Sequence, residues 1–116
     1  MHIGKNSYLN GASLITTDDT EIVIGENCLI SFDVVMRTDT HNFTDVTKPI
    51  IEQGNVAKSI RIGDDVWIGQ GVYIMPGVTI GSHVIVGAKA VVTGDIPDYS
   101  VAVGVPARVI RKRNLE

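Results

Sequence analysis

A six-residue period dominates the second half of the chain. From residue 62 onward an aliphatic residue recurs at every sixth position, and a second apolar series runs four residues after the first. The first series is Ile62, Ile68, Ile74, Ile80, Val86 and Val92, and the second is Val66, Val72, Val78, Val84, Ala90 and Ile96. Two inward positions in every six residues fit neither the 3.6-residue period of a helix nor the two-residue period of a long strand.

Short strands separated by sharp bends explain this period. Three such units close a triangular coil of about 18 residues, and successive coils stack at about the 4.8 Å spacing of paired strands. Glycine follows the first apolar series at residues 63, 69, 81 and 87, where a side chain would crowd the next coil. Pro76-Gly77 is typical of the centre of a type II turn. The sequence therefore predicts an all-β, parallel helix of coils.

The composition agrees with a narrow aliphatic interior. Valine and isoleucine supply 31 of the 116 residues, leucine supplies four, and aromatic residues make up 5%. This balance argues against a helix bundle, and the 44% hydrophobic content argues against a disordered chain. Charged residues interrupt every apolar stretch, so we expect no membrane span. A single cysteine, Cys28, forms no internal disulfide, which favours a cytoplasmic location.

The same period appears upstream in two other phases. One set of inward residues is Ile24, Ile30 and Met36 with Cys28, Val34 and Thr40 as partners, and an earlier set is Ile3, Leu9 and Ile15 with Ser7 and Ser13 as partners. Residues 42–59 contain no acceptable repeat and are interpreted as a loop that leaves the coil, which we expect to be functional. With residues 107–116 as a short tail, a single domain over residues 1–116 holds about five coils.

The charge is distributed unevenly. The net charge is −3, yet the last nine residues carry Arg108, Arg111, Lys112 and Arg113 against one Glu116, which leaves residues 1–107 at −6. An acidic body gives no broad nucleic-acid surface. The basic end is either a solvated tail or a place for one phosphorylated ligand.

Four runs of sequence resemble one known family. IGENCLIS, IRIGDDVWIGQGVYIMPGVTIG, VIVGAKAVVTGDIP and VAVGVPARVIR are similar to segments of the hexapeptide-repeat acetyltransferases, and the likeness extends from Ile3 to Arg111. The nearest subgroup is the maltose, galactoside and capsule-polysaccharide O-acetyltransferases. This resemblance implies a left-handed parallel β-helix, a homotrimer with active sites between neighbouring subunits, and transfer from acetyl-CoA to a sugar hydroxyl, with no metal.

The resemblance makes His41 the candidate general base. His41 ends the run MRTDTH immediately before the expected loop, where the family has the histidine that deprotonates the acceptor hydroxyl. The residue type suits this chemistry, because imidazole titrates near neutral pH and an alcohol is a poor nucleophile there. Asp39 precedes His41 by two residues and shares its face in an extended segment, so it is a candidate for orienting the ring.

The resemblance also supplies candidate coenzyme A contacts, residue by residue. They are Trp67 of VWIG, Gln70, Ala88 of VGAKA, Thr93, Arg108 and Arg111. The two arginines suit phosphate groups because a guanidinium donates two parallel hydrogen bonds. Gly94 departs from the family, which frequently has lysine at that position.

The acceptor end of the site is less well matched. The asparagine that contacts sugar in galactoside-type relatives aligns with Gly11, next to Asn10, and Asn10 is the candidate substrate contact. The chain begins at the first coil, whereas those relatives carry an N-terminal segment with an acidic sugar contact.

Two alternative functions stay open at this stage. One is a non-catalytic β-helix that serves as an assembly or binding module. The other is a γ-carbonic-anhydrase-like metalloenzyme, which the spacing of His2, His41 and His83 does not favour.

Overall fold

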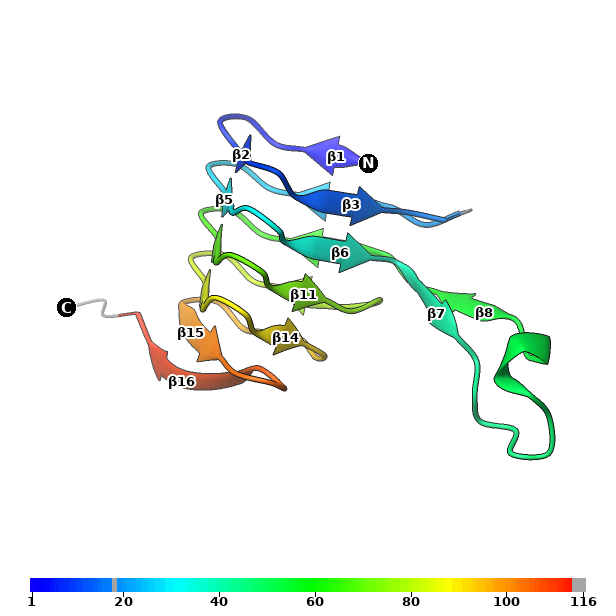
Figure 1. The fold of residues 1–116 in the computed structure, drawn as a ribbon. Coiled ribbons are helices and arrows are strands. Elements are labelled where there is room, and N and C mark those ends of the chain that lie inside the picture. Colours follow the sequence, from blue (N-terminus) through cyan, green and yellow to red (C-terminus); the bar gives the residue numbers. More distant parts are fainter. Residues whose placement is uncertain (18, 114–116) are drawn as a thin grey trace.

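The protein is a stack of triangular coils (Figure 1). The computed structural model describes residues 1–17 and 19–113. Sheet 1 contains β1 (His2–Ile3), β4 (Ile22–Ile24), β9 (Ile60–Ile62) and β12 (Thr79–Ile80). Sheet 2 contains β2 (Tyr8–Leu9), β5 (Leu29–Ile30), β10 (Trp67–Ile68), β13 (Ile85–Val86), β15 (Ser100–Val103) and β16 (Arg108–Lys112). Sheet 3 contains β3 (Ser13–Ile15), β6 (Val35–Arg37), β11 (Tyr73–Ile74) and β14 (Val91–Val92).

The predicted coil number is confirmed. Four coils contribute one strand to each of the three sheets, and a fifth contributes a bridge from Ile96 to Ile80 and then β15. Strands of successive coils pair in parallel, as in the pairing of Ile62 with Ile80. Among the described residues, no helix is long and apolar enough to cross a membrane.

The two predicted apolar series form the core. All twelve residues of the second-half series are buried, and so are five of the six residues predicted for the second coil. Sheet register places equivalent residues above one another, so that Met36, Ile74 and Val92 form one column inside sheet 3. Cys28 occupies an inward position, where burial raises the pKa of its thiol, as expected for an apolar packing residue and not for a nucleophile.

The phase predicted for the first coil is wrong in sheet 3. Leu14, not Ile15, pairs with Met36 and packs against the core, while Ile15 pairs with Arg37 and is 37% exposed. Ser13, predicted as an inner partner, is exposed. The turn before β3 is one residue shorter than its counterpart in the second coil, because Leu14 follows Leu9 by five positions whereas Met36 follows Ile30 by six.

The expected excursion from the coil is a hairpin. β7 (Asp39–His41) and β8 (Asn55–Ala57) pair antiparallel, and a short 3-10 turn, η1 (Ile50–Glu52), lies in the connecting loop (Figure 1). We call residues 39–57 the hairpin. The pairing begins before residue 42, where the sequence predicted the loop to start, so Thr40 is exposed on β7 and does not reach the core.

The basic segment expected as a tail is instead a strand. β16 pairs antiparallel with β15 and extends sheet 2 at the end of the stack. This pairing fixes the backbone that carries Arg108 and Arg111.

The close stacking of coils predicts that Gly63→Ala destabilises the fold. A Cβ on Gly63 would lie 2.8 Å from the carbonyl carbon of Gly81 in the next coil, so the backbone must shift. We expect a loss of about 1–3 kcal/mol in the free energy of unfolding, measured by urea denaturation. Gly94→Ala is the matched control, because nothing lies within 4 Å of its added Cβ. Equal stability of the two variants would contradict the stacking argument.

Candidate functional site

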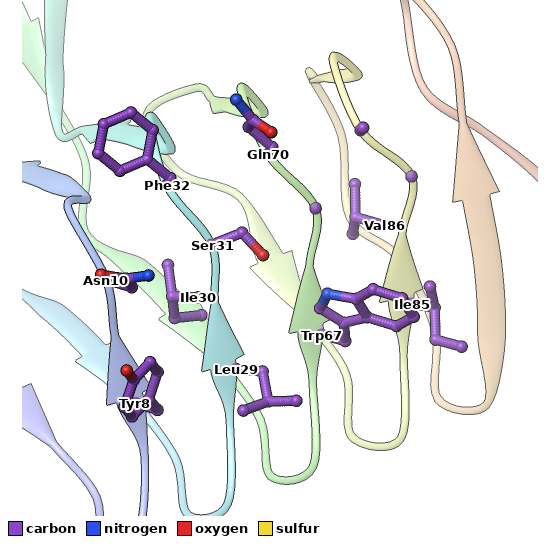
Figure 2. A pocket seen from close by; sticks show the side chains of 13 residues that line it. Tyr8, Asn10, Leu29, Ile30, Ser31, Phe32, Trp67, Gln70, Ile85 and Val86 are labelled. Atoms are coloured by element: carbon purple, nitrogen blue, oxygen red, sulfur yellow. The ribbon is translucent and has the colours of Figure 1, made fainter.

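A groove of about 630 Å³ runs along the outer face of sheet 2 (Figure 2). Strand alternation turns Leu29, Trp67 and Ile85 outward while their neighbours Ile30, Ile68 and Val86 point toward the core. Register then aligns Tyr8, Leu29, Trp67 and Ile85 across four strands, and Trp67 is 52% exposed. The result is an apolar floor that is open to solvent.

Polar side chains and the backbone of small residues border this floor. Asn10, Ser31 and Gln70 contribute side-chain amide and hydroxyl groups (Figure 2). Gly69 and Ala88 lie in adjacent coils at the corner between sheets 2 and 3, and a Cβ on Gly69 would lie 2.7 Å from the Ala88 nitrogen. An apolar floor with amide donors and acceptors along one edge suits a long, thin ligand that contains amide groups.

The groove brings together four residues that the sequence analysis selected. Trp67, Gln70 and Ala88, which the sequence analysis assigned to one ligand, lie there, and Asn10 lies at the same groove. Sequence reasoning missed the other floor residues, Tyr8, Leu29 and Ile85, and the bend residue Phe32. Tyr8, Leu29 and Ile85 could have been found from the repeat, because each directly precedes the residue of its strand that points toward the core.

The remaining candidate ligand contacts lie elsewhere on the chain. Thr93 and Arg108 line a second, smaller cavity of about 220 Å³ with Gly94, Asp95, Ile96, Ala107 and Val109. Arg111 is exposed on β16 opposite Val101, and it lines neither of these cavities.

Two of the basic residues near the end of the chain, Lys112 and Arg113, hydrogen-bond to the coils. Lys112 Nζ donates to the Asp98 carbonyl at 3.1 Å and to Ser100 Oγ at 3.0 Å. Arg113 Nη1 donates to Asp65 Oδ2 at 3.1 Å, and the same oxygen lies 2.8 Å from His83 Nδ1. Lys112 and Arg113 therefore hold the strand on the coils.

His83 is half-exposed, as expected of a surface histidine, and it belongs to this anchor. Its ring stacks on Tyr99 with a centroid distance of 4.7 Å. The hydrogen bond from His83, together with Arg113, lowers the pKa of Asp65.

His41 lies on the hairpin, away from the groove. It is exposed at the end of β7, opposite Asn55 of β8. The hairpin follows β6 of sheet 3 and precedes β9 of sheet 1, so it leaves the coil at the corner opposite sheet 2 (Figure 1). One chain thus presents His41 and the groove on opposite sides of its triangular section.

Asp39 lies on the same strand as His41, but its hydrogen bond is to another residue. Arg37 Nε donates to Asp39 Oδ1 at 2.8 Å. The Asp39 side chain is 8% exposed, whereas that of Arg37 is 44% exposed. The structure therefore gives Asp39 a partner that the sequence analysis did not consider.

The loop next to His41 is held in shape by Gln53. Gln53 Nε2 donates to the carbonyls of Asp45 and Lys48, and its Oε1 accepts from the Asp45 amide. Thr47 donates to the Asp45 carboxylate through its hydroxyl and its amide, which lowers the pKa of Asp45. Within the described part of the chain, no cluster of three His, Cys, Asp or Glu side chains could hold a metal ion.

Comparison with known proteins decides the family. A family model described as bacterial transferase hexapeptide (six repeats) matches residues 59–94. A solved hexapeptide-repeat acetyltransferase of Vibrio cholerae O1 biovar eltor, complexed with acetyl coenzyme A, is 30% identical with a TM-score of 0.78, and the alignment covers 97% of this chain and 71% of that one. The chain belongs to the hexapeptide-repeat acetyltransferase family. Its coils are accordingly those of the left-handed parallel β-helix.

Longer relatives match this hexapeptide-repeat chain over nearly its whole length. Galactoside O-acetyltransferase of Escherichia coli K12 is 44% identical over 115 residues, which cover 98% of this chain and 55% of the relative. Polysialic acid O-acetyltransferase of Escherichia coli O1:K1 is 39% identical, with 97% and 36% covered. A solved galactoside acetyltransferase in complex with coenzyme A is 43% identical, with a TM-score of 0.85 and 97% and 55% covered. The chain thus spans about half or less of these relatives.

The anchor at Asp65 predicts a defined pH dependence of stability. Because its partners lower the pKa of Asp65, they stabilise the folded chain above about pH 4, the ordinary value for Asp, and this contribution is lost as the pH falls through the lowered pKa. Urea denaturation should show that Asp65→Asn loses about 1 kcal/mol or less at neutral pH, since the pair is half-exposed.

The Asp65→Asn variant should also lose less stability than wild type between about pH 5 and pH 2. Asp33→Asn is the control, because Asp33 is exposed with a left-handed φ of 61°, close to the 54° of Asp65. Identical pH profiles for Asp65→Asn and wild type would contradict the anchor.

Proposed function

We propose that this chain is an acetyl-CoA-dependent O-acetyltransferase that acts on a saccharide hydroxyl. The observation that carries the proposal is the sheet 2 groove, whose apolar floor and amide-bearing edge occur in a chain that is 43% identical to a protein solved with coenzyme A. The groove volume of about 630 Å³ lies within the usual range of small-molecule sites. A cytoplasmic location goes with this proposal, because acetyl-CoA is a cytoplasmic metabolite.

The residues of the groove fit the pantetheine arm of coenzyme A. Its dimethyl and methylene groups would lie on Leu29, Trp67 and Ile85, and its two amides would meet Gln70 and the backbone near Ala88. The phosphates would bind at the basic end of the chain, through Arg108 and Arg111 with Thr93 nearby. Lys112 and Arg113 are already engaged with the coils, whereas Arg108 Nη1 donates to the adjacent Ala107 carbonyl at 3.1 Å and Arg111 is exposed, so these two arginines are the proposed phosphate contacts.

His41 is the proposed general base. Acetyl-CoA supplies the acetyl group as a thioester. His41 takes the proton of the acceptor hydroxyl, the hydroxyl oxygen bonds to the acetyl carbonyl carbon, the carbon–sulfur bond breaks, and the thiolate leaving group takes up a proton. Backbone amides at the bends are the proposed donors to the transient oxyanion. Asp39 is a proposed positioning residue for His41, because both lie on β7 two residues apart.

Separation of His41 from the groove supports a shared active site. The groove lies on the face of sheet 2 and the hairpin leaves at the corner opposite that face, so neither can serve the other within one chain. A homotrimer would place the hairpin of one subunit beside the groove of its neighbour. Asn10 would then lie at the acceptor end of the groove, where its side-chain amide can hydrogen-bond sugar hydroxyls.

His41→Ala tests the chemistry of the proposal. Loss of a general base should lower kcat by about 10²–10⁴-fold and leave coenzyme A binding and the oligomer intact. Thiol release from acetyl-CoA across a panel of sugars, with serine as a further acceptor, measures the rate. His2→Ala is the control, since His2 is an exposed histidine on β1. Unchanged turnover in His41→Ala would remove the mechanism, and no coenzyme A binding by wild type would favour a non-catalytic module.

Trp67→Ala tests the groove as the coenzyme site. The variant removes the largest side chain of the apolar floor, so the Kd for coenzyme A should rise about tenfold or more in titration calorimetry. Tyr73→Ala is the matched control, because Tyr73 precedes Ile74 in β11 of sheet 3 as Trp67 precedes Ile68 in sheet 2. An unchanged Kd in Trp67→Ala, or an equal rise in Tyr73→Ala, would place the ligand elsewhere.

A further inference from the structure

A nearly buried carboxylate lies at the base of the hairpin. β6 ends at Arg37, the chain bends at Thr38, and β7 begins at Asp39. The ion pair from Arg37 Nε to Asp39 Oδ1, at 2.8 Å, therefore spans the bend at which the hairpin leaves the coil. Because the Asp39 side chain is 8% exposed, its negative charge needs a partner, and Arg37 supplies one.

The bend itself is fixed by hydrogen bonds of Thr38. This fully buried residue donates its amide to the Ile15 carbonyl, and its own carbonyl accepts from the Lys58 amide at 2.8 Å. Its hydroxyl oxygen lies 2.8 Å from the Thr20 hydroxyl and accepts from the Thr17 amide. The backbone on both sides of Thr38, between Arg37 and Asp39, is thereby tied to neighbouring segments, which limits how far the two partners can move apart.

Few other charges lie on the elements packed against His41. β8, the strand paired with β7, carries Asn55, Val56 and Ala57, none of which titrates. Lys58 follows β8, and its side chain packs against Gly77 of the coil. The charged residues of the connecting loop are Asp45, Lys48 and Glu52, and the Asp45 carboxylate accepts from Thr47. The Arg37–Asp39 pair therefore places a charge pair at the start of the strand that carries His41, with Arg37 at the end of β6 and Asp39 as the first residue of β7.

We propose that Arg37 is a positioning residue for the reaction of His41, acting through Asp39. Arg37 holds one oxygen of the Asp39 carboxylate in a fixed orientation and balances its charge, so that His41 experiences a nearly neutral pair. This inference rests on the proposed function, because it assigns a role relative to the general base. Removal of either partner leaves the other charge unbalanced at the start of β7, two residues before His41 or further, with opposite consequences for the protonation of the imidazole.

The sign of the effect distinguishes this role from a structural one. Arg37→Gln leaves the carboxylate, which stabilises the imidazolium, so the titration midpoint of the His41 ring should move to higher pH. Asp39→Asn leaves the guanidinium, so the midpoint should move to lower pH. We expect each shift to be on the order of half a pH unit, with the double variant returning toward wild type.

NMR titration of the His41 ring in this chain measures these shifts without requiring activity. The acid limb of the kcat/KM profile should move in the same directions, and Arg37→Lys should restore the wild-type midpoint with a lower kcat, because lysine keeps the charge and loses the Nε geometry. Midpoints that stay constant, or that move in one direction in both single variants, would overturn the proposal. Failure of the proposed function would show separately, as His41→Ala retaining wild-type turnover.

Discussion

Hydrogen bonding between successive coils is the constraint on which the rest of this structure depends. The amides of Gly25 and Gly63 donate to the carbonyls of Ile62 and Ile80 in the next coil, at 2.9 and 2.8 Å. Such pairing stacks residues of equal position directly above one another. The interior enclosed by the three sheets is therefore narrow, and it is filled by columns of single aliphatic side chains, one from each coil. This explains why valine and isoleucine dominate the core and why large aromatic residues are scarce inside.

The same stacking creates the candidate site. When inward residues form columns, the residues that precede them form columns on the outside, and in sheet 2 this outer column is Tyr8, Leu29, Trp67 and Ile85. The stacking that packs the core of the β-helix therefore also produces a straight apolar floor on the outside of sheet 2, which is bordered by backbone amides at the bends. The hairpin interrupts the repeat once, between the second and third coils, and carries His41 away from that floor.

The sequence predicted the regular part of the fold and less of the irregular part. The two apolar series from residue 62 to residue 96 were predictable because each residue repeats the contacts of the residue one coil earlier. The inward residue of the first coil in sheet 3 was not predictable, because Leu14 and Ile15 are adjacent and both apolar, so the sequence does not reveal that the preceding turn is one residue shorter. Within the site, the groove positions of Trp67, Gln70 and Ala88 followed from the repeat and the family resemblance, whereas the Arg37–Asp39 pair depends on a bend that no periodicity encodes.

A crystal structure of this chain with bound coenzyme A is the most direct test of the account. The account predicts the pantetheine arm along Leu29, Trp67 and Ile85, with its thiol directed toward His41 of a neighbouring subunit and room for an acceptor hydroxyl between them. Coenzyme A bound away from sheet 2, or a thiol with no His41 from any subunit beside it, would contradict the account.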